Sequence, residues 1–266
     1  MTAVQLGLMR TRVELLMFCR QRGTVFFSFL FPIVMLVLFG VVFGHGDRVT
    51  DRRGTTVPFS QYFLPGMLAA GIVLVSFQTV AIAITVERTD GTLQRLASTP
   101  LPPASYFFGK CGLVLVVGAV QAMLLLIVAA TVFAVPLPVT VGKWLTFAWV
   151  FVLGTTAGGL LGVAFSSVAR SATSVGAVVA APTLVLQFIS GVYFAFPDLP
   201  HWLQDVAAVF PLKWTAQGMR SVFLPGGFAT LEPGGGWERG LTAVVLLAWA
   251  VVGLVLCLRT FRWNRG

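Results

Sequence analysis

Charged side chains gather in one polar stretch, residues 87–110, which separates two long apolar runs. Its charged members are Glu87, Arg88, Asp90, Arg95 and Lys110. This mixture of acids and bases suits ion pairing with a partner surface, and no nucleophile in the chain falls in a motif that pairs it with a base. Gly109-Lys110 is similar to the end of a phosphate-binding loop, but Ala104 occupies the position where that loop needs its first glycine. We therefore expect no ATP site and no catalytic residue on this chain.

Histidine and cysteine give no sign of a metal centre. His45 and His201 lie in predicted loops, and Cys19, Cys111 and Cys257 are far apart in the sequence. Zinc sites and disulfide frameworks have cysteines at close or regular spacings, and this chain has neither pattern. We expect the cysteines to act as small apolar side chains, and we expect this chain to bind no metal or cofactor.

Uncharged polar residues interrupt the apolar runs at positions where they could line a path. The candidates for such a substrate path are Ser76, Gln78, Thr79 and Gln187. The alternative is that they form hydrogen bonds between neighbouring helices, which contribute on the order of 1 kcal/mol each in membranes. The sequence leaves both interpretations open.

The composition places these residues in a membrane protein. Hydrophobic residues make up 57% of the chain and charged residues 10%, whereas soluble domains carry about 25% charged residues. The apolar runs reach the roughly 20 residues that a helix needs to cross a bilayer. The sequence thus predicts an all-α polytopic membrane protein with a single domain. Basic residues retained on the cytoplasmic side explain the net charge of +9, so no nucleic-acid partner is expected.

Six apolar runs predict six transmembrane helices. They cover residues 24–43, 63–86, 112–135, 144–168, 174–196 and 241–258. A loop at 87–111 joins the second and third helices, and a long segment at 197–240 precedes the last. Residues 1–23 predict an amphipathic helix at the membrane interface, because apolar side chains recur there at helical spacing. These are Leu6, Met9, Val13, Leu16 and Met17.

The distribution of Lys and Arg predicts the orientation. Those on the side of the two termini are Arg10, Arg12, Arg20, Arg22, Arg88, Arg95, Lys110, Arg170, Arg259, Arg262 and Arg265. Those on the other side are Arg48, Arg52, Arg53, Lys143, Lys213, Arg220 and Arg239. The side with more basic residues faces the cytoplasm. Both termini are therefore expected in the cytoplasm.

The six predicted spans contain no Asp, Glu, Lys, Arg or His. An ionisable residue inside a membrane is costly and usually functional, and ion-coupled transporters depend on such residues. A secondary transporter driven by an ion gradient is therefore disfavoured. It remains an alternative, together with a membrane scaffold that has no transport activity.

A glycine motif predicts close helix packing in the fourth span. Gly154, Gly158 and Gly162 are four residues apart and lie on one helix face, where the absence of side chains lets two backbones approach. The partner helix belongs either to the same chain, which we favour, or to a second copy.

The segment at 197–240 contains two short helical patterns on either side of a proline. Apolar side chains lie on one side of the first pattern, and the second carries a basic residue. We predict a re-entrant or interfacial hairpin that closes the outer mouth of the helix bundle, with an ordinary exposed loop as the alternative. The residues expected to form this outer gate are Trp202, Leu203, Val206, Phe210, Pro211 and Arg220.

Residues 87–99 predict a short helix parallel to the membrane. A helix held between two spans moves both when it is pushed, so we predict that it couples the membrane helices to a separate motor protein. The alternative is that its charges only keep the loop in water. The residues expected to take part are Glu87, Arg88, Asp90, Gly91, Leu93 and Leu96, the two leucines facing the span ends.

Several short pieces of this loop also match a known pattern: Glu87-Arg88, Gly91-Thr92, Leu96, Thr99-Pro100 and Gly109-Lys110. With them the chain resembles ABC-2-type transporter permeases, and the branch that it is similar to is that of bacterial drug and antibiotic exporters of the daunorubicin-resistance kind. One departure lies in the outer hairpin, where Phe210 precedes Pro211 and the family often has asparagine.

The resemblance implies a partnership. Two permease subunits, identical or homologous, would join two ATP-binding cassette subunits in the bacterial cytoplasmic membrane, with ATP and magnesium bound by the partner ATPase. Such a complex would export drugs, antibiotics, lipids or glycan-lipids.

Overall fold

The computed structural model describes residues 3–43, 48–99, 103–168 and 171–260 of the 266-residue chain. His45, Pro100, Arg170, Arg262 and Arg265, which entered the predictions above, lie outside these ranges. The α-helices are α1 (Ala3–Arg20), α2 (Arg22–Val42), α3 (Phe59–Val73), α4 (Thr79–Thr89), α5 (Thr92–Ala97), α6 (Pro103–Val132), α7 (Val141–Phe165), α8 (Ala172–Ile189), α9 (His201–Val209), α10 (Pro211–Phe223) and α11 (Arg239–Thr260). A π-helical turn spans Leu74–Gln78, 3-10 turns cover Phe196–Asp198 and Gly226–Leu231, and the strands are β1 (Arg48–Thr50) and β2 (Thr56–Pro58).

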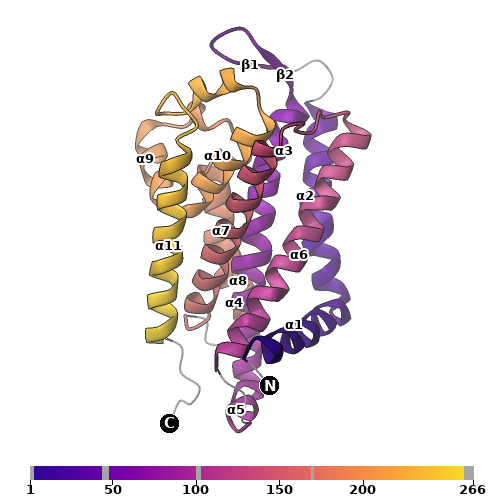
Figure 1. Cartoon of the computed structure of the whole chain (residues 1–266), viewed down its shortest axis with the longest axis vertical. Helices are drawn as coiled ribbons and strands as arrows, with labels where there is room; N and C mark the ends of the chain where they lie inside the picture. Colours follow the sequence, from indigo (N-terminus) through magenta and orange to yellow (C-terminus); the bar gives the residue numbers. More distant parts are fainter. Residues whose placement is uncertain (1–2, 44–47, 100–102, 169–170, 261–266) are drawn as a thin grey trace.

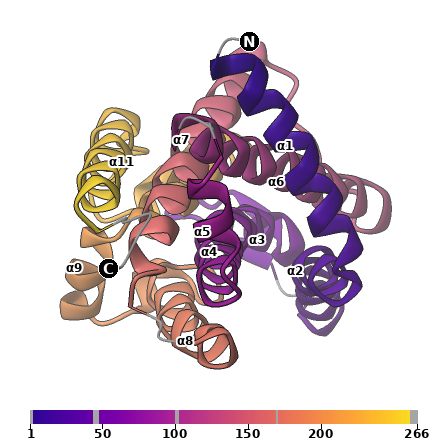
Figure 2. The ribbon, with the colours of Figure 1, turned by 90° about the horizontal axis from the view of Figure 1, so that it is seen from below.

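The long helices run side by side as a bundle with two different ends (Figure 1). Helices α1 and α5 lie at one end, where α11 also finishes, and the two strands with α9 and α10 lie at the other. Seen from the α5 end, α3 and α4 occupy the middle, while α2, α8 and α11 lie at the periphery (Figure 2). Helix α3 packs against α2, α6, α7 and α10, and α11 packs mainly against α7.

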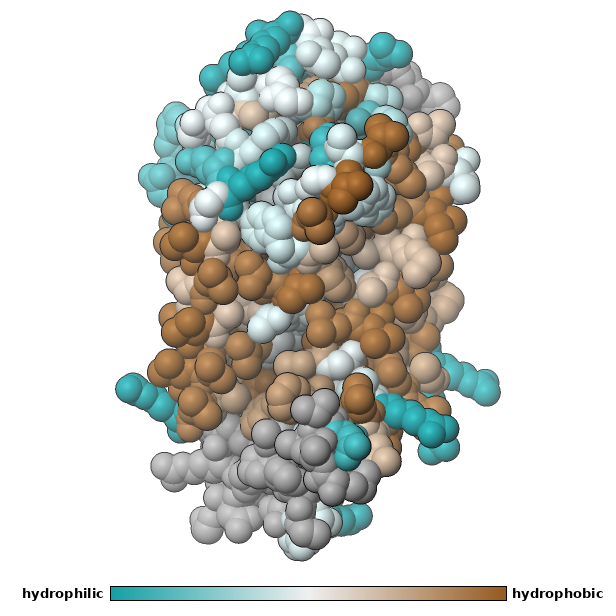
Figure 3. Space-filling view, in the orientation of Figure 1, coloured by the Kyte–Doolittle hydropathy of each residue, from teal (hydrophilic) through white to brown (hydrophobic). Residues whose placement is uncertain are grey.

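Among the described residues, five helices are long and apolar enough to cross a membrane. They are Arg22–Val42, Phe59–Thr89, Ser105–Val132, Val141–Phe165 and Arg239–Arg259. The fifth predicted span corresponds to α8, which is apolar but shorter over Thr173–Ile189. On the face shown in Figure 3, exposed apolar side chains form a broad band across the middle of the molecule, with hydrophilic surface above it. This band is the surface that a bilayer would cover.

Several element boundaries differ from the prediction. The second predicted span begins at Phe59 and continues to Thr89, and α6 begins at Pro103, nine residues before the predicted start at 112. The fifth ends at Ile189, well before residue 196. A turn follows it, because Gly191 has a φ of +73° that other residues rarely adopt. The prediction of an all-α polytopic fold agrees with the helical bundle, and the structure adds a short antiparallel hairpin of β1 and β2 in the loop before α3.

The local sequence explains that hairpin. The Asp51 carboxylate accepts hydrogen bonds from the backbone N–H groups of Arg53 and Thr55, both at 2.8 Å, which is a turn that aspartate commonly builds. Gly54 adopts a φ of +83° at the same turn. β-Branched residues such as Val49 and Val57 pair across the strands.

The glycine stripe of α7 packs within the chain. A Cβ atom on Gly162 would lie 2.6 Å from the carbonyl oxygen of Phe77, and one on Gly158 would overlap the hydroxyl of Ser76. Both partners belong to the π-helical turn of Leu74–Gln78. The two glycines therefore let α7 contact the middle of the long α3–α4 segment.

The N-terminal helix α1 docks on α6 through a face that contains a charge. Gly7, Glu14 and Phe18 are buried, while Met9 and Leu16 of the predicted apolar stripe are 57% and 52% exposed. The docked face of α1 therefore combines close packing at Gly7 and Phe18 with the ion pairs of Glu14.

Candidate functional site

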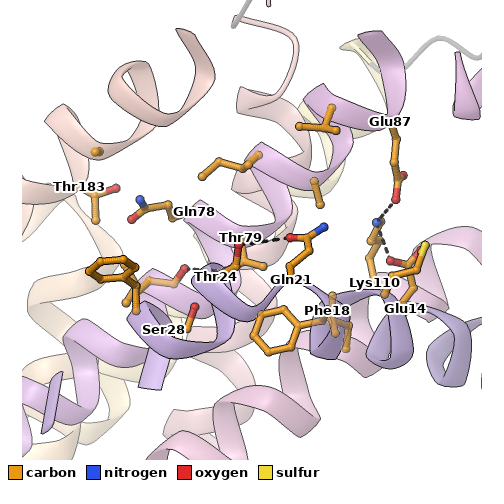
Figure 4. A pocket seen from close by; sticks show the side chains of 18 of the residues that line it. Glu14, Phe18, Gln21, Thr24, Ser28, Gln78, Thr79, Glu87, Lys110 and Thr183 are labelled. Atoms are coloured by element: carbon orange, nitrogen blue, oxygen red, sulfur yellow. Dashed lines mark hydrogen bonds and ion pairs between the residues drawn. The ribbon is translucent and has the colours of Figure 1, made fainter. Parts of the chain in front are cut away.

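A cavity of about 610 Å³ opens between α2, the α3–α4 segment and α8, towards the end of the bundle that carries α1 and α5. Figure 4 shows polar side chains that reach into it from these different elements. Apolar side chains such as Phe18, Phe27, Phe31 and Leu184 make up much of the remaining wall. A pocket of this size with a few polar groups in an apolar wall has the usual character of a ligand site.

Three of the four predicted path residues line this cavity. Gln78, Thr79 and Gln187 contribute to the wall, together with Thr183 and with Ser28, which the prediction missed. Ser76 does not belong to the cavity lining. Its side chain is fully buried, and its hydroxyl donates to the Ile72 carbonyl at 2.6 Å, so for Ser76 the structure shows a packing role inside the bundle.

An ion cluster closes the end of the cavity nearest α1. Lys110 of α6 donates to Glu14 of α1 at 2.8 Å and to Glu87 of α4 at 2.6 Å. Arg10 forms a second ion pair with Glu14 at 2.6 Å and lies 4.0 Å from Glu87. The hydroxyl of Tyr106 donates to Glu87 at 2.6 Å. The cluster thus joins three helices and balances two positive charges with two negative ones.

Burial makes this cluster energetically important. The side chains of Lys110 and Glu14 are 2% and 3% exposed, and that of Glu87 is 12% exposed. A buried charge without its partner is strongly destabilising. The expectation that Glu87 faces water or a partner protein was therefore wrong, because its carboxylate points into the protein and lines the cavity.

Sequence reasoning missed this cluster, although one signal was present. Glu14 is the only carboxylate before Asp47 and follows Arg10 by one helical turn. A single carboxylate on a basic amphipathic helix at the membrane is costly unless it is paired, so its presence indicates a cationic partner inside the protein. The identity of that partner, Lys110, required the fold.

The predicted coupling helix is shorter than expected. Helix α5 covers only Thr92–Ala97, and Gly91, with a φ of +78°, separates it from α4. Leu93 is buried and Leu96 packs against the core, whereas Gln94 and Arg95 are exposed. Exposed polar groups therefore lie at the extreme end of the bundle (Figure 1).

Asp90 fixes the connection into α5. Its carboxylate accepts a hydrogen bond from the backbone N–H of Thr92 at 2.9 Å. Hydrogen bonds from the side chain and backbone of Thr92 hold the pKa of Asp90 below its ordinary value. Asp90 is exposed and, unlike Glu87, remains available to a partner.

The predicted outer gate is divided between two environments. In α9, Trp202 and Val206 are 66% and 43% exposed, and Leu203 and Phe210 are half-buried. The buried positions of this helix are Gln204 and Ala207. The expectation of one sealing apolar face is therefore wrong for α9, because its most apolar side chains point away from the bundle.

Helix α10, in contrast, is buried along its whole length from Leu212 to Phe223. Arg220 forms an ion pair with Glu232 at 2.6 Å and donates to the Gly191 carbonyl at 3.2 Å. Since Gly191 follows α8, this contact links the outer helices to a helix that lines the cavity. The predicted outer gate included Arg220 but not its ion-pair partner Glu232.

Lys213 is a second buried cation in α10. Its ammonium group lies 3.7 Å from the centre of the Trp214 ring and 5.4 Å from that of Phe196, and it donates to the Gln217 amide oxygen. Burial lowers the pKa of Lys213 to about 8. Helix α10 therefore buries two cations, Lys213 and Arg220, together with hydroxyl and amide side chains. The sequence analysis predicted only a gate surface at this position.

Comparison with known proteins agrees with the bundle of apolar helices. Residues 5–224 match the family model described as ABC-2 type transporter. The chain is 24% identical over 209 residues to a Porphyra purpurea protein named transport permease ycf38, a match that covers 77% of this chain and 69% of the relative. It is 22% identical over 176 residues to an Escherichia coli K12 protein named multidrug ABC transporter permease YbhR, covering 66% of this chain and 47% of that relative.

The family match spans most of the chain, including all the elements that form the cavity and the ion cluster. A family of membrane transporters also accounts for the long apolar helices. The chain belongs to the ABC-2 type transporter family, the membrane permeases of ABC transporters.

Proposed function

We propose that this protein is the permease subunit of an ATP-driven exporter that moves an amphipathic substrate out of the cell. The observation that carries the proposal is the cavity of about 610 Å³ with uncharged polar groups in an otherwise apolar wall. Its floor is the ion cluster of Glu14, Glu87 and Lys110, and Glu87 lies five residues before Thr92, where α5 begins. A movement of α5 would therefore reach the cavity through a short and rigid connection.

A separate ATPase subunit would supply the energy. Helix α5 presents Gln94 and Arg95 to its surroundings while Leu93 anchors it to the core. This arrangement suits a contact that transmits force, because the exposed groups can bind a partner and the buried leucine ties them to the bundle. ATP and magnesium would then be bound by the partner ATPase.

A second permease copy would cover the cavity. Gln78, Thr183 and Gln187 lie on apolar helical segments, and lipid chains would offer no hydrogen bonds to their polar groups. A dimer, made of two identical or two homologous permeases, would shield these groups from lipid. This supports a complex of two permeases and two ATPases.

The proposed topology has six spans, with α8 as the short fifth one, and both termini in the cytoplasm. Helix α8 has 18 residues, which corresponds to about 27 Å of helix and is close to the thickness of a bilayer core. Helices α9 and α10 would form the re-entrant hairpin on the outer side, next to the β1–β2 hairpin. The membrane would be the bacterial cytoplasmic membrane.

Thiol labelling of intact cells tests this topology. Arg52 lies exposed in the turn between β1 and β2, so Arg52→Cys is expected to react with a membrane-impermeant maleimide. Asp51 is less suitable for this test because its side chain is only 5% exposed. Arg95→Cys, which is exposed at the opposite end, is the matched control and should react only after the cells are permeabilised. Labelling of Arg95→Cys in intact cells would reverse the orientation.

A reporter in the cavity tests the function without a known substrate. Ala181 lines the cavity and is exposed to it. In a protein without the native cysteines, we expect the maleimide labelling rate of Ala181→Cys to change at least about tenfold when ATP and magnesium are added to the permease–ATPase complex, because alternating access opens and closes the path. Vanadate should trap the changed rate. A rate that ignores ATP while the complex hydrolyses it would contradict an ATP-driven transport path.

A further inference from the structure

The polar residues of the cavity form stripes on three of its sides. They are Gln21, Thr24 and Ser28 along the start of α2, Gln78 and Thr79 where the π-helical turn meets α4, and Thr183 and Gln187 on α8. Spacings of three and four residues place members of one stripe on the same helix face. Figure 4 shows Ser28, Gln78 and Thr183 reaching into the same space. All seven residues are uncharged amides and hydroxyls.

The hydrogen bonds within the chain leave much of this lining available. The hydroxyls of Thr79 and Thr183 donate to backbone carbonyls at 3.3 and 2.8 Å, so their oxygens can still accept. Within the described residues, neither Ser28 nor Gln78 has a hydrogen-bond partner for its side chain. The cavity therefore presents donors and acceptors together.

Gln187 adds an oriented donor. Its amide oxygen accepts from the Tyr193 hydroxyl at 2.7 Å. This bond fixes the amide, so its NH₂ group is the part that remains for a ligand. Gln187 is 4% exposed and lines the cavity, which makes it a buried, pre-oriented contact.

The charges at the cavity floor are already satisfied. Lys110 and Arg10 neutralise Glu14 and Glu87 at distances of 2.6 to 2.8 Å. The remaining charged residue in the lining, Asp90, is exposed at the rim. A net charge placed in the buried part of this cavity, away from Asp90, would lose its hydration without meeting an unpaired opposite charge, which is unfavourable.

We propose that the cavity binds an uncharged amphipath whose polar part carries hydroxyl groups, as in an alkyl glycoside. A hydroxyl group both donates and accepts, so it complements the mixed amide and hydroxyl lining, while Phe27, Phe31 and Leu184 contact the apolar part. This inference rests on the proposed function only in taking the cavity as the substrate path.

Competition for the Ala181→Cys reporter tests this ligand class. The purified permease, without its native cysteines, is placed in lipid nanodiscs with no ATP and no ATPase. The probes share one chain and differ in head group: decyl maltoside, decyltrimethylammonium and decyl phosphate, each below its micellar concentration. We expect decyl maltoside to slow maleimide labelling at a concentration at least about tenfold lower than either charged probe, because the latter lack a counter-charge.

Two variants separate binding from partition into the membrane. Gln78→Leu should weaken protection by decyl maltoside about five- to tenfold, the value of one hydrogen bond. Gln5→Leu, the same change at an exposed amide of α1 outside the cavity lining, should leave protection unchanged. A reporter at Leu258, which is 74% exposed on α11, measures partition alone.

Each outcome decides the proposal. Equal or better protection by a charged probe, protection that is the same at Leu258→Cys, or no protection by decyl maltoside would overturn it. Because this assay uses no ATP, its failure leaves the proposed exporter intact, and failure of the ATP-dependent labelling would leave the ligand class intact.

Discussion

Replacing Lys110 by methionine is expected to lower the free energy of unfolding by about 3–5 kcal/mol, the usual effect of breaking a buried ion pair. The change removes the one ammonium group that binds both Glu14 and Glu87. Two carboxylates that are 3% and 12% exposed would then be left with Arg10 as their counter-charge. Unfolding titrations in mixed detergent micelles, with the proportion of folded protein followed by near-ultraviolet circular dichroism, measure the effect.

Two further variants show whether the charge is responsible. Arg12→Met removes a cation from the exposed side of α1 and should change stability by less than about 1 kcal/mol. The triple variant Glu14→Gln, Glu87→Gln, Lys110→Met removes the charges together and should recover much of the lost stability, because no buried charge remains unpaired. If Lys110→Met is as stable as the wild type, the cluster does not hold α1 against α4 and α6.

Reversing the charge of Arg95 is expected to weaken binding of the ATPase subunit at least about tenfold and to reduce export in proportion. Arg95 is exposed on α5 at the end of the bundle, so the change should cost little stability. At an interface, however, a misplaced like charge costs several kcal/mol. The measurement is the dissociation constant of purified ATPase and Arg95→Glu permease in nanodiscs, beside ATP-dependent transport in vesicles.

Arg53→Glu supplies the matched control. It makes the same reversal at an exposed residue of the β-hairpin, at the opposite end of the molecule. It should leave ATPase binding and export unchanged. Unaltered ATPase binding by Arg95→Glu would remove α5 as the contact. The same reversal at Glu87 would be uninformative, because it would also disrupt the buried ion cluster.

Local sequence features predicted the class of protein and the approximate position of its helices. Runs of apolar residues have to match the thickness of a bilayer, and this requirement acts on each helix separately. Leu93 and Leu96 likewise identified the inward face of α5, because a short amphipathic helix shows which side is buried. The sequence also shows that Gly109-Lys110 does not complete a phosphate-binding loop, because Ala104 occupies the position of its first glycine.

Local sequence features could not predict the rotation of each long helix about its own axis. A helix that is apolar on all sides has no pattern to show which face meets another helix. The sequence could not separate Ser76, which packs on α7, from Gln78, which lines the cavity two residues later. The apolar stripe of α1 was visible, but lipid and protein are similar surroundings for such side chains, so it did not identify the docked face.

The ion cluster depended entirely on tertiary structure. Glu14 and Lys110 are 96 positions apart, and Glu87 and Lys110 are 23 apart, so no helical or strand period relates them. Their pairing follows from how α1, α4 and α6 meet, and burial at that junction turns separate surface charges into a single network. The sequence by itself determined that this chain is a bundle of membrane helices with a polar loop. The fold decided which charges are buried and which polar groups face the cavity, because both depend on contacts between segments distant in the chain.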